Sequence, residues 1–296
     1  MKKTVTLIIH GQRKLSNKTL ETIQLMESEP ILIVKKQITK GPLDASDIAR
    51  KASLDSDLVI AVGGDGTCNE VINGLMTTPN PEIVFGVIPN GTGNDFVRNF
   101  PSFDPYTFVT AIVENSVRTI DLGKITFGKV SHYFLNAADI GFGARVIETM
   151  NRQRLKGIGG KFSYSLAIIR TFFTYRKPVI TVQNDDFHFE GKSLMIVFSN
   201  GTTFGHGLQI YPEAKLNSGK LGLAVIGKVS LFQYAKNLGK LKDGRKIVHP
   251  EVKYHEFQKI HITTANRNLV VETDGEIAGR SPIMVEVVPS VLQVIA

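Results

Sequence analysis

Two aspartates stand inside glycine-rich stretches, and each stretch follows a run of apolar residues. Leu58–Val62 leads into Gly63-Gly64-Asp65-Gly66-Thr67, and Ile83–Ile88 leads into Pro89-Asn90-Gly91-Thr92-Gly93-Asn94-Asp95. Glycines between a strand end and a helix N-terminus let the backbone approach closely, and the free amides there suit an anion such as a phosphate. An acid beside a phosphate is repulsive unless a cation stands between them. The pattern therefore indicates a phosphate with a divalent metal, as in nucleotide triphosphate chemistry.

Neither stretch is a standard phosphate loop, because the chain has no G-x-x-x-x-G-K-[ST] and the first stretch does not read G-x-G-x-x-G. Taken alone, the first stretch is better explained as a tight strand–helix turn in which Asp65 only caps. The second stretch repeats the pattern, and parallel neighbouring strands bring both to the sheet edge where open α/β sheets bind ligands. Thr67 and Glu70 have capping-box spacing, which predicts Thr67 as the helix N-cap.

The elements that position these loops are predicted by apolar periodicity. Continuous apolar strands separated by amphipathic helices predict a doubly wound parallel sheet covered on both faces. The expected strands are Val5–Ile9, Ile31–Val34, Leu58–Val62 and Ile83–Ile88, and the expected helices lie around Leu20–Met26, at Asp44–Ala52 and at Cys68–Met76.

The pattern changes near Val117–Ile125, where short strands divided by Gly, Asn and Asp turns take over and predict an antiparallel sandwich or barrel. We therefore expect an α/β nucleotide-binding domain over residues 1–120 and a β-sandwich domain over 121–296, with the last residues free to pack back on the first domain. The expected strands are Tyr133–Ala137, Val179–Gln183, Leu194–Ser199, Leu221–Ile226, Lys259–Thr263, Leu269–Glu272 and Met284–Val288, with helices around Phe162–Tyr175 and Leu231–Leu241.

Composition sets the broad class. A chain of 296 residues suggests about two domains. Its single cysteine, Cys68, excludes a disulfide framework and multi-cysteine metal sites, and fits a reducing, cytoplasmic compartment. The start MKKTVTLIIHG is predicted to be a strand rather than a signal peptide, because no small-residue cleavage site follows. The net charge of +8 permits an acidic partner without choosing among phosphate esters, nucleic acid and anionic membrane.

The two loops, with Asn69-Glu70-Val71 and Asn73-Gly74 after the first, resemble the diacylglycerol kinase catalytic domain family, and most closely its small soluble bacterial lipid kinases. Further motifs follow in the family's order: Asn136-Ala137-Ala138-Asp139-Ile140-Gly141-Phe142-Gly143, Ser199-Asn200-Gly201, Gly205-His206-Gly207, Tyr211-Pro212-Glu213-Ala214 and Asp274-Gly275-Glu276. The GGDGT run alone is shared with NAD kinases and phosphofructokinase relatives. The second loop and Asp274-Gly275-Glu276 separate the lipid kinases from those.

The resemblance implies a fold and a site. The active site would lie in the cleft between the α/β domain and the β-sandwich domain. Asp65 and Asp95 would hold Mg²⁺ directly or through water, and Asp121 would support that network, although a turn-capping role for Asp121 is equally open. The ATP contacts implied are Thr39, Gly63, Gly64, Asp65, Gly66, Thr67, Asn69, Glu70, Gly91, Thr92 and Asn94.

Glu276 matches the family's proposed general base, with Asp65 and Asp95 as the other catalytic acids. An alcohol that attacks the γ-phosphorus must lose a proton, and a carboxylate near it can accept that proton. The alternative is that Asp274-Gly275 is an ordinary hairpin turn with Glu276 as its solvated flank. Asp65 is the rival base, because related sphingosine-type kinases are argued to use the loop acid.

Two departures from the family pattern bear on ligands. The first strand leads into His10-Gly11-Gln12-Arg13-Lys14 instead of an Asn-Pro-x-Ser-Gly loop. Two consequences are open: either the charges of Arg13 and Lys14 replace the backbone contacts to the phosphates, or the affinity for ATP is low. In Lys215–Lys220, Ser218 stands where the family's structural Mg²⁺ site has an aspartate. A neutral hydroxyl is a poor ligand for a hard cation, so we expect that metal to be absent.

The expected activity is an ATP- and Mg²⁺-dependent lipid kinase of diacylglycerol or a related glycerolipid, cytoplasmic and peripheral to an anionic membrane. Nucleic acid is not an expected partner, and a homodimer is left open. Alternatives are a kinase of a sphingoid base or NAD, or a non-catalytic nucleotide or lipid sensor. The basic clusters Arg152–Lys161 and Lys236–Lys246 are either membrane contacts or solvated faces. The apolar helix Phe162–Tyr175 is core or faces an acyl chain, and His206 is a candidate for the cleft.

Overall fold

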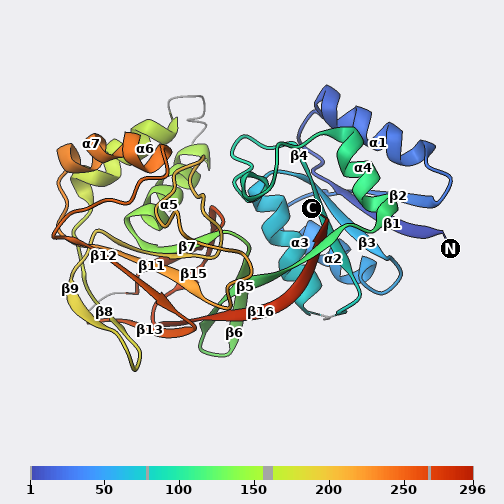
Figure 1. The fold of residues 1–296 in the computed structure, drawn as a ribbon. Helices are drawn as coiled ribbons and strands as arrows, with labels where there is room; N and C mark the ends of the chain where they lie inside the picture. Colours follow the sequence, from blue (N-terminus) through green and yellow to red (C-terminus); the bar gives the residue numbers. More distant parts are fainter. Residues whose placement is uncertain (1, 78–79, 156–162, 266–267, 296) are drawn as a thin grey trace.

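The first part of the chain alternates strand and helix (Figure 1). A computed structural model describes residues 2–77, 80–155, 163–265 and 268–295. The elements are β1 (Lys3–Ile9), α1 (Asn17–Ser28), β2 (Leu32–Ile38), α2 (Asp44–Ala52), β3 (Leu58–Gly63), α3 (Asp65–Thr77), β4 (Val84–Pro89), the 3-10 helix η1 (Phe96–Asn99) and α4 (Pro105–Glu114).

A parallel sheet with strand order β2-β1-β3-β4 forms the centre of this half. Its apolar side chains pack into two separate cores, one on each face of the sheet. Ala49 of α2 and Val71 of α3 pack in one core, and Ile23 of α1 and Val109 of α4 pack in the other. Helices therefore cover both faces of the sheet, and the predicted doubly wound α/β arrangement is confirmed.

The second part of the chain is mainly antiparallel strands, as predicted. Its elements are β5 (Val117–Phe127), β6 (Val130–Phe134), β7 (Ala137–Gly141), α5 (Phe142–Leu155), α6 (Ser163–Thr174), β8 (Val179–Gln183), β9 (His188–Lys192), β10 (Met195–Ser199), β11 (Leu221–Ile226), α7 (Leu231–Lys242), β12 (Val252–Phe257), β13 (Lys259–Thr264), β14 (Val270–Thr273), β15 (Glu276–Arg280) and β16 (Ile283–Ile295).

The predicted strand Tyr133–Ala137 is wrong, because the chain divides there into β6 and β7. The division falls at Leu135 and Asn136. Their backbone N–H groups donate to the carboxylate of Asp274 instead of a neighbouring strand, at 2.8 and 2.9 Å. The same side chain thus ends one strand and begins the next.

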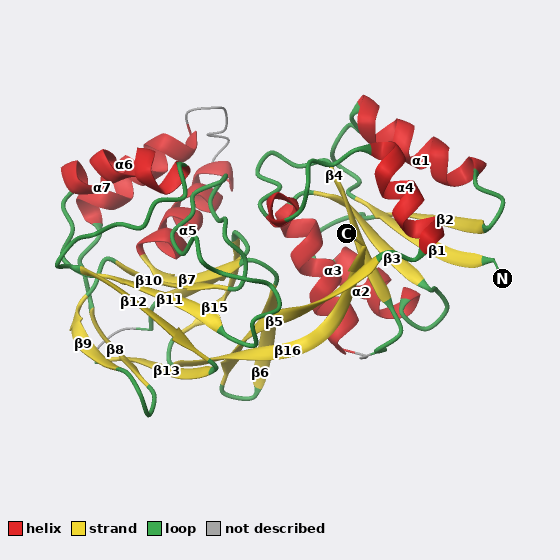
Figure 2. Cartoon of the chain, viewed as in Figure 1, coloured by secondary structure: helices red, strands yellow, loops and turns green. Residues whose placement is uncertain are grey.

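Three layers make up the second half (Figure 2). A six-stranded sheet, β12-β11-β10-β7-β14-β15, packs one face against β16, β13 and β8 of the large sheet, through a core that includes Ile140, Ile196, Ile260 and Val285. Helices α5, α6 and α7 cover its other face. None of the helices in the described ranges is long and apolar enough to cross a bilayer.

Helix α5 was not predicted, and only its last residues, from Arg152, belong to the predicted basic cluster. It begins at Phe142, directly after β7, and the Asp139 carboxylate accepts a hydrogen bond of 3.0 Å from Ala144 N in its first turn. Of the basic cluster Arg152–Lys161, residues 156–161 lie outside the described residues, as does Phe162 at the start of the predicted apolar helix.

Strand β16 joins the two halves into one ten-stranded sheet. It contains the predicted strand Met284–Val288 but continues to Ile295. Along its length it pairs antiparallel with β13 and β5, and at its end it pairs parallel with β4, where Gln293 opposes Val84. The domain boundary predicted at residue 120 falls within β5.

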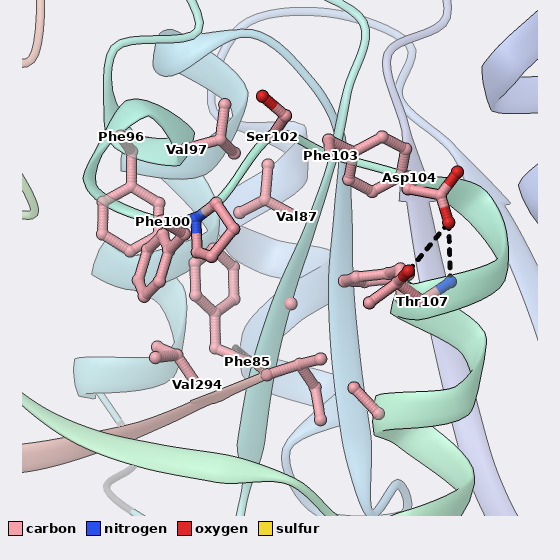
Figure 3. A pocket seen from close by; sticks show the side chains of 15 residues that line it. Phe85, Val87, Phe96, Val97, Phe100, Ser102, Phe103, Asp104, Thr107 and Val294 are labelled. Atoms are coloured by element: carbon pink, nitrogen blue, oxygen red, sulfur yellow. Dashed lines mark hydrogen bonds between the residues drawn. The ribbon is translucent and has the colours of Figure 1, made fainter.

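A small apolar cavity of about 120 Å³ lies in the first half, between η1, α4 and β4 (Figure 3). Phe96 stacks edge-on against Phe100 at 5.3 Å, and Phe103 packs against Phe108 at the same distance. The Asp104 carboxylate caps α4 by accepting hydrogen bonds from Thr107 N and Oγ1, both of 2.9 Å. This packing anchors the backbone that directly follows Asp95.

Candidate active site

The two glycine-rich loops meet at the carboxyl edge of the parallel sheet. Strands β3 and β4 pair in register up to Gly63 and Pro89. Beyond them, a β-carbon added at Gly91 would lie 2.4 Å from Gly64 Cα, and one added at Gly93 would lie 2.7 Å from Asp65 Oδ2. Glycine is needed at these positions because the loops touch each other there.

Asp65 and Asp95 lie against each other in this arrangement. Asp65 Oδ1 accepts a hydrogen bond of 2.6 Å from the Asp95 backbone N–H. The Asp95 carboxylate in turn accepts from His206 N at 2.9 Å and Gly207 N at 2.7 Å, both from the second half of the chain. Burial, and next the charge of Asp95, raise the pKa of Asp65. The Arg98 guanidinium lies 3.5 Å from Asp95 Oδ1, yet the charge of Asp95 still raises the pKa of Asp65, so a further cation would relieve the repulsion between the two acids.

Thr67 is not the N-cap of α3, contrary to the capping-box prediction. The helix begins at Asp65, two residues earlier, so Thr67 lies buried within its first turn. Glu70 does not reach back to the helix start, since its Oε2 accepts from the backbone N–H of Ala45 at 3.2 Å. Glu70 therefore ties α3 to the start of α2.

The other predicted nucleotide contacts divide into two groups. One group lines a large cavity in front of the loops: Thr39, Gly64, Asp65, Gly66, Thr67, Glu70 and Thr92. The other group is absent from that lining and holds the loops from behind: Gly63, Asn69, Gly91 and Asn94. Asn94, for example, has a φ of 51° and its Oδ1 accepts from Gly91 N at 2.9 Å.

Glu276 reaches this site from the opposite half. It begins β15 after a tight turn in which Asp274 and Gly275 both have positive φ, of 48° and 89°. A β-carbon at Gly66 would lie 2.6 Å from Glu276 Oε1, so the carboxylate stands directly over the first turn of α3. The structure therefore brings Glu276 to the cavity that Asp65 and Asp95 line.

The turn that carries Glu276 is anchored by the buried carboxylate of Asp274. It accepts hydrogen bonds from Asn69 Nδ2 and from the backbone N–H groups of Leu135, Asn136 and Ala137, at 2.8 to 3.1 Å. Burial raises the pKa of Asp274 to about 6, and these hydrogen bonds partly offset that rise. Asp274 thus locks the turn to both halves of the chain.

Asp121, predicted to support the metal, is not among the residues that line the cavity. Its buried carboxylate accepts from Gly219 N at 2.7 Å and Ser290 N at 2.8 Å. It therefore fastens the Lys215–Lys220 segment to β16. Within that segment Ser218 Oγ bonds to the carbonyl oxygens of Lys215 and Lys220.

Asp139 and Glu272 form a second acid pair that sequence reasoning missed. They face each other on adjacent strands β7 and β14, and both line the cavity. Burial raises the pKa of Asp139 to about 7, and burial together with Asp139 raises the pKa of Glu272 well above its usual range. Glu272 Oε2 also accepts from Gly275 N at 2.6 Å. The pair thus supports the Glu276 turn.

A single cavity of about 1170 Å³ joins the polar loops to an apolar chamber in the second half. Pockets for small molecules are typically about 300–1000 Å³. The polar end includes His10, Arg13 and His206 with the loop residues, whereas the far end lies among α5, α6, α7 and the six-stranded sheet. Apolar side chains line that end, including Val146, Met150, Ile168, Ile210, Leu238 and Ile247.

A parallel-sheet edge with two glycine-rich loops, facing an antiparallel half across such a cavity, is the arrangement of a two-part kinase fold. Residues 4–125 match the diacylglycerol kinase catalytic domain, and residues 136–296 match the YegS C-terminal NAD kinase beta sandwich-like domain. The chain belongs to the diacylglycerol kinase family of lipid kinases.

Relatives agree with this assignment. The chain is 31% identical over 240 residues to the diacylglycerol kinase of Staphylococcus saprophyticus, covering 80% of this chain and 76% of that one. It is 28% identical over 244 residues to the diacylglycerol kinase of Bacillus subtilis, covering 81% and 78%. A crystal structure of a diacylglycerol kinase from Bacillus anthracis has the same fold, with a TM-score of 0.71 and 21% identity over 99% of this chain and 96% of that one.

Proposed function

We propose that the protein transfers the γ-phosphate of ATP, in a Mg²⁺-dependent reaction, to the hydroxyl of diacylglycerol or a related glycerolipid. The observation that carries this proposal is the one cavity that runs from the loop acids to an apolar chamber. A nucleotide needs the polar end, and acyl chains need the apolar end. An acceptor with a polar head and a long apolar tail fits both.

The nucleotide phosphates would lie on the loops after β3 and β4. The first turn of α3 carries backbone N–H groups without helical partners, and its dipole favours negative charge. Gly64, Gly66 and Thr92 line the cavity there. Arg13 lines it from the loop after β1, which supports a charge contact in place of a backbone contact.

Asp65 and Asp95 would hold Mg²⁺, and the residues present fit that ion. Mg²⁺ in kinase sites is bound through one or two carboxylates together with substrate phosphates and water. The raised pKa of Asp65 reflects burial beside a second acid, and a divalent cation would reverse that effect. When bound, the ion would neutralise phosphate charge.

Glu276 would act as the general base. Its carboxylate accepts the proton of the lipid hydroxyl while that oxygen bonds to the γ-phosphorus. The bond from the γ-phosphorus to the bridging oxygen breaks, and ADP leaves with that oxygen. Glu276 comes from the half that holds the apolar chamber, and its carboxylate stands over the first turn of α3, which supports a position between the acceptor hydroxyl and the γ-phosphate.

The acceptor would be taken from a membrane. A net charge of +8 favours peripheral binding to an anionic surface on the cytoplasmic side. In this proposal the protein works at a bilayer and withdraws the lipid hydroxyl into the cavity.

A substrate panel tests the proposal. Labelled ATP and Mg²⁺ are incubated with diacylglycerol, phosphatidylglycerol, sphingosine and NAD, and each product is separated and counted. Phosphorylated diacylglycerol is the expected product. Labelled sphingosine or NAD phosphate alone would give the activity to a different acceptor. ATP binding without any phosphorylated product would favour a nucleotide or lipid sensor.

A further inference from the structure

The outer side of α6 carries a row of exposed apolar residues. Leu166, Ile169 and Phe173 follow one another at i, i+3 and i+7, and they are 52%, 48% and 75% exposed. Ala167 and Thr171, on the inner side of the same helix, are buried. A helix that is apolar on its solvent side as well as its core side needs a covering surface.

Helix α7, near α6, also exposes an apolar residue. Phe232 in its first turn is 76% exposed, and Lys236 and Lys240 follow at i+4 and i+8 on the same side. The two helices share a neighbour, because the ring of Phe142 contacts Phe172 of α6 at 5.6 Å and Tyr234 of α7 at 6.1 Å. Both lie at the same end of the molecule (Figure 1).

The charges carried by these two segments themselves have one sign. Residues 163–178 and 228–242 contain no Asp or Glu. In the part of the chain that the structure describes, no ion pair neutralises their exposed cations, Arg170, Arg176, Lys228, Lys236, Lys240 and Lys242. Apolar side chains ringed by unpaired lysine and arginine match an anionic bilayer. A second copy of the chain would bring like charges together instead.

The same surface adjoins the large cavity. Ile169 and Lys242 are both exposed and both line the cavity. A lipid that left a bilayer beneath α6 and α7 would therefore meet the apolar chamber directly.

We infer that the outer face of α6 and α7 docks on anionic bilayers, with Phe173 and Phe232 entering the lipid and Lys236 and Lys240 at the headgroups. This docking face rests on the proposed lipid kinase function, since it supplies the acceptor to the cavity. Each near-surface lysine is worth about 1 kcal/mol at an anionic leaflet. Lys236→Ala with Lys240→Ala should therefore weaken vesicle partitioning by about 30-fold.

Tryptophan fluorescence tests the docking face directly, because the natural chain contains no tryptophan. Phe173→Trp and Phe232→Trp each introduce one reporter on the face. Tyr106→Trp is the matched control, since Tyr106 is 71% exposed on α4 in the other half of the molecule. Phosphatidylglycerol vesicles should shift the emission of the first two variants to the blue, brominated lipid should quench it, and the control should not respond.

Two results would overturn the docking face. One is solvent-like emission from both face reporters while the protein sediments with the vesicles. The other is a blue shift without vesicles, accompanied by a doubling of mass in light scattering, which would make the face an interface between copies. For the lysine pair, Lys18→Ala with Lys51→Ala removes the same charge elsewhere and should leave partitioning nearly unchanged.

An activity comparison separates this inference from the proposed function. Phe173→Ser with Phe232→Ser should lower phosphorylation of vesicle-borne diacylglycerol more than tenfold, and leave that of dispersed short-chain diacylglycerol within about twofold. If the double variant phosphorylates vesicle-borne diacylglycerol as fast as the natural chain does, the docking face is wrong, and the proposed lipid kinase function is unaffected. Failure of the natural chain on both substrates would sink the proposed function, while the fluorescence would still report docking.

Discussion

The side-chain amide of Asn69, on α3, donates a hydrogen bond of 2.9 Å to the carboxylate of Asp274, 205 residues further along the chain. Asn69 Nδ2 also donates to the Tyr133 carbonyl at 3.2 Å. This amide connects the helix that follows the first glycine-rich loop with the turn that carries Glu276. This buried side chain is therefore one of the contacts that fix the relative position of the two ends of the site, beside those of Asp95 with His206 and Gly207.

Replacing Asn69 with Leu should lower the free energy of unfolding by about 1–3 kcal/mol, because Asp274 loses a buried donor. It should also reduce kcat with little change in the KM for ATP, because Asn69 does not line the cavity. Denaturant unfolding and steady-state kinetics measure the two effects. A loss confined to ATP affinity would instead make Asn69 a direct nucleotide contact.

Replacing Glu276 with Gln removes the proton acceptor and keeps the shape. General base catalysis is typically worth about 10²–10⁴-fold, so kcat should fall by that factor while ATP affinity stays near normal. Asp65→Asn, by contrast, should also damage Mg²⁺-ATP binding. If Glu276→Gln keeps most of its kcat on the same vesicles, Glu276 is only a turn residue and Asp65 becomes the base.

Replacing Asp95 with Asn should abolish activity and weaken the Mg²⁺ dependence of nucleotide binding. His206 N and Gly207 N donate to different oxygens of Asp95, so the amide keeps an acceptor for only one of them, and it loses the charge that a cation requires. Isothermal titration of ATP with and without Mg²⁺ measures the change. Normal Mg²⁺-ATP turnover in the variant would contradict the metal assignment.

The buried pair of Asp139 and Glu272 predicts a pH-dependent stability. Both pKa values are raised, so between about pH 4 and pH 7 the folded chain binds more protons than the unfolded chain. The contribution of this pair to the free energy of unfolding is therefore largest below about pH 4, and it falls as the pH rises through 7. Asp274, with its pKa of about 6, adds a dependence of the same sign.

Asp139→Asn isolates the pair, because it leaves Asp274 unchanged. Its free energy of unfolding should fall less steeply than that of the natural chain between pH 4 and pH 7, as measured by urea unfolding at several pH values. His132, whose pKa is lowered by burial, has the opposite sign but cancels in the comparison. Parallel curves for the two chains would show that Asp139 does not carry the raised pKa.

Chelation tests the prediction that no structural metal is held at Lys215–Lys220. Direct hydrogen bonds to Asp121 and Ser218 already hold this segment. Without nucleotide, EDTA should move Tm by less than about 2 °C, because even 1 kcal/mol shifts Tm by about 2–4 °C in a chain of this size. A large drop in Tm would reveal a metal at this segment, although Ser218 stands where the family has an aspartate.

Local patterns were sufficient for the first half of the fold. The helix Asp44–Ala52 has the predicted bounds, and the loops of Asp65 and Asp95 meet because adjacent parallel strands must end at one edge. Helix α5 was missed because Gly143 and its polar residues conceal the apolar periodicity. Thr67 was misassigned because capping-box spacing also occurs inside a helix that starts two residues earlier.

Non-local register accounts for the rest. Asp139 and Glu272 look like unrelated polar residues in the sequence, and only the pairing of β7 with β14 makes them neighbours. The close approach of Glu276 to Gly66 likewise depends on how the two halves pack. A turn dipeptide predicts a turn, but it carries no information about what lies opposite.

The pairing of strand β16 with both halves of the chain has a consequence for stability and assembly. The strand pairs with β4 of the first half and with β13 of the second, so melting it would uncover both parts of the ten-stranded sheet at once. We therefore expect one cooperative unfolding transition. A fragment ending near residue 125 would expose an unprotected β4 edge and tend to aggregate. Because Val84 and Gln293 are far apart in sequence, this closure should also be a late and slow event in folding.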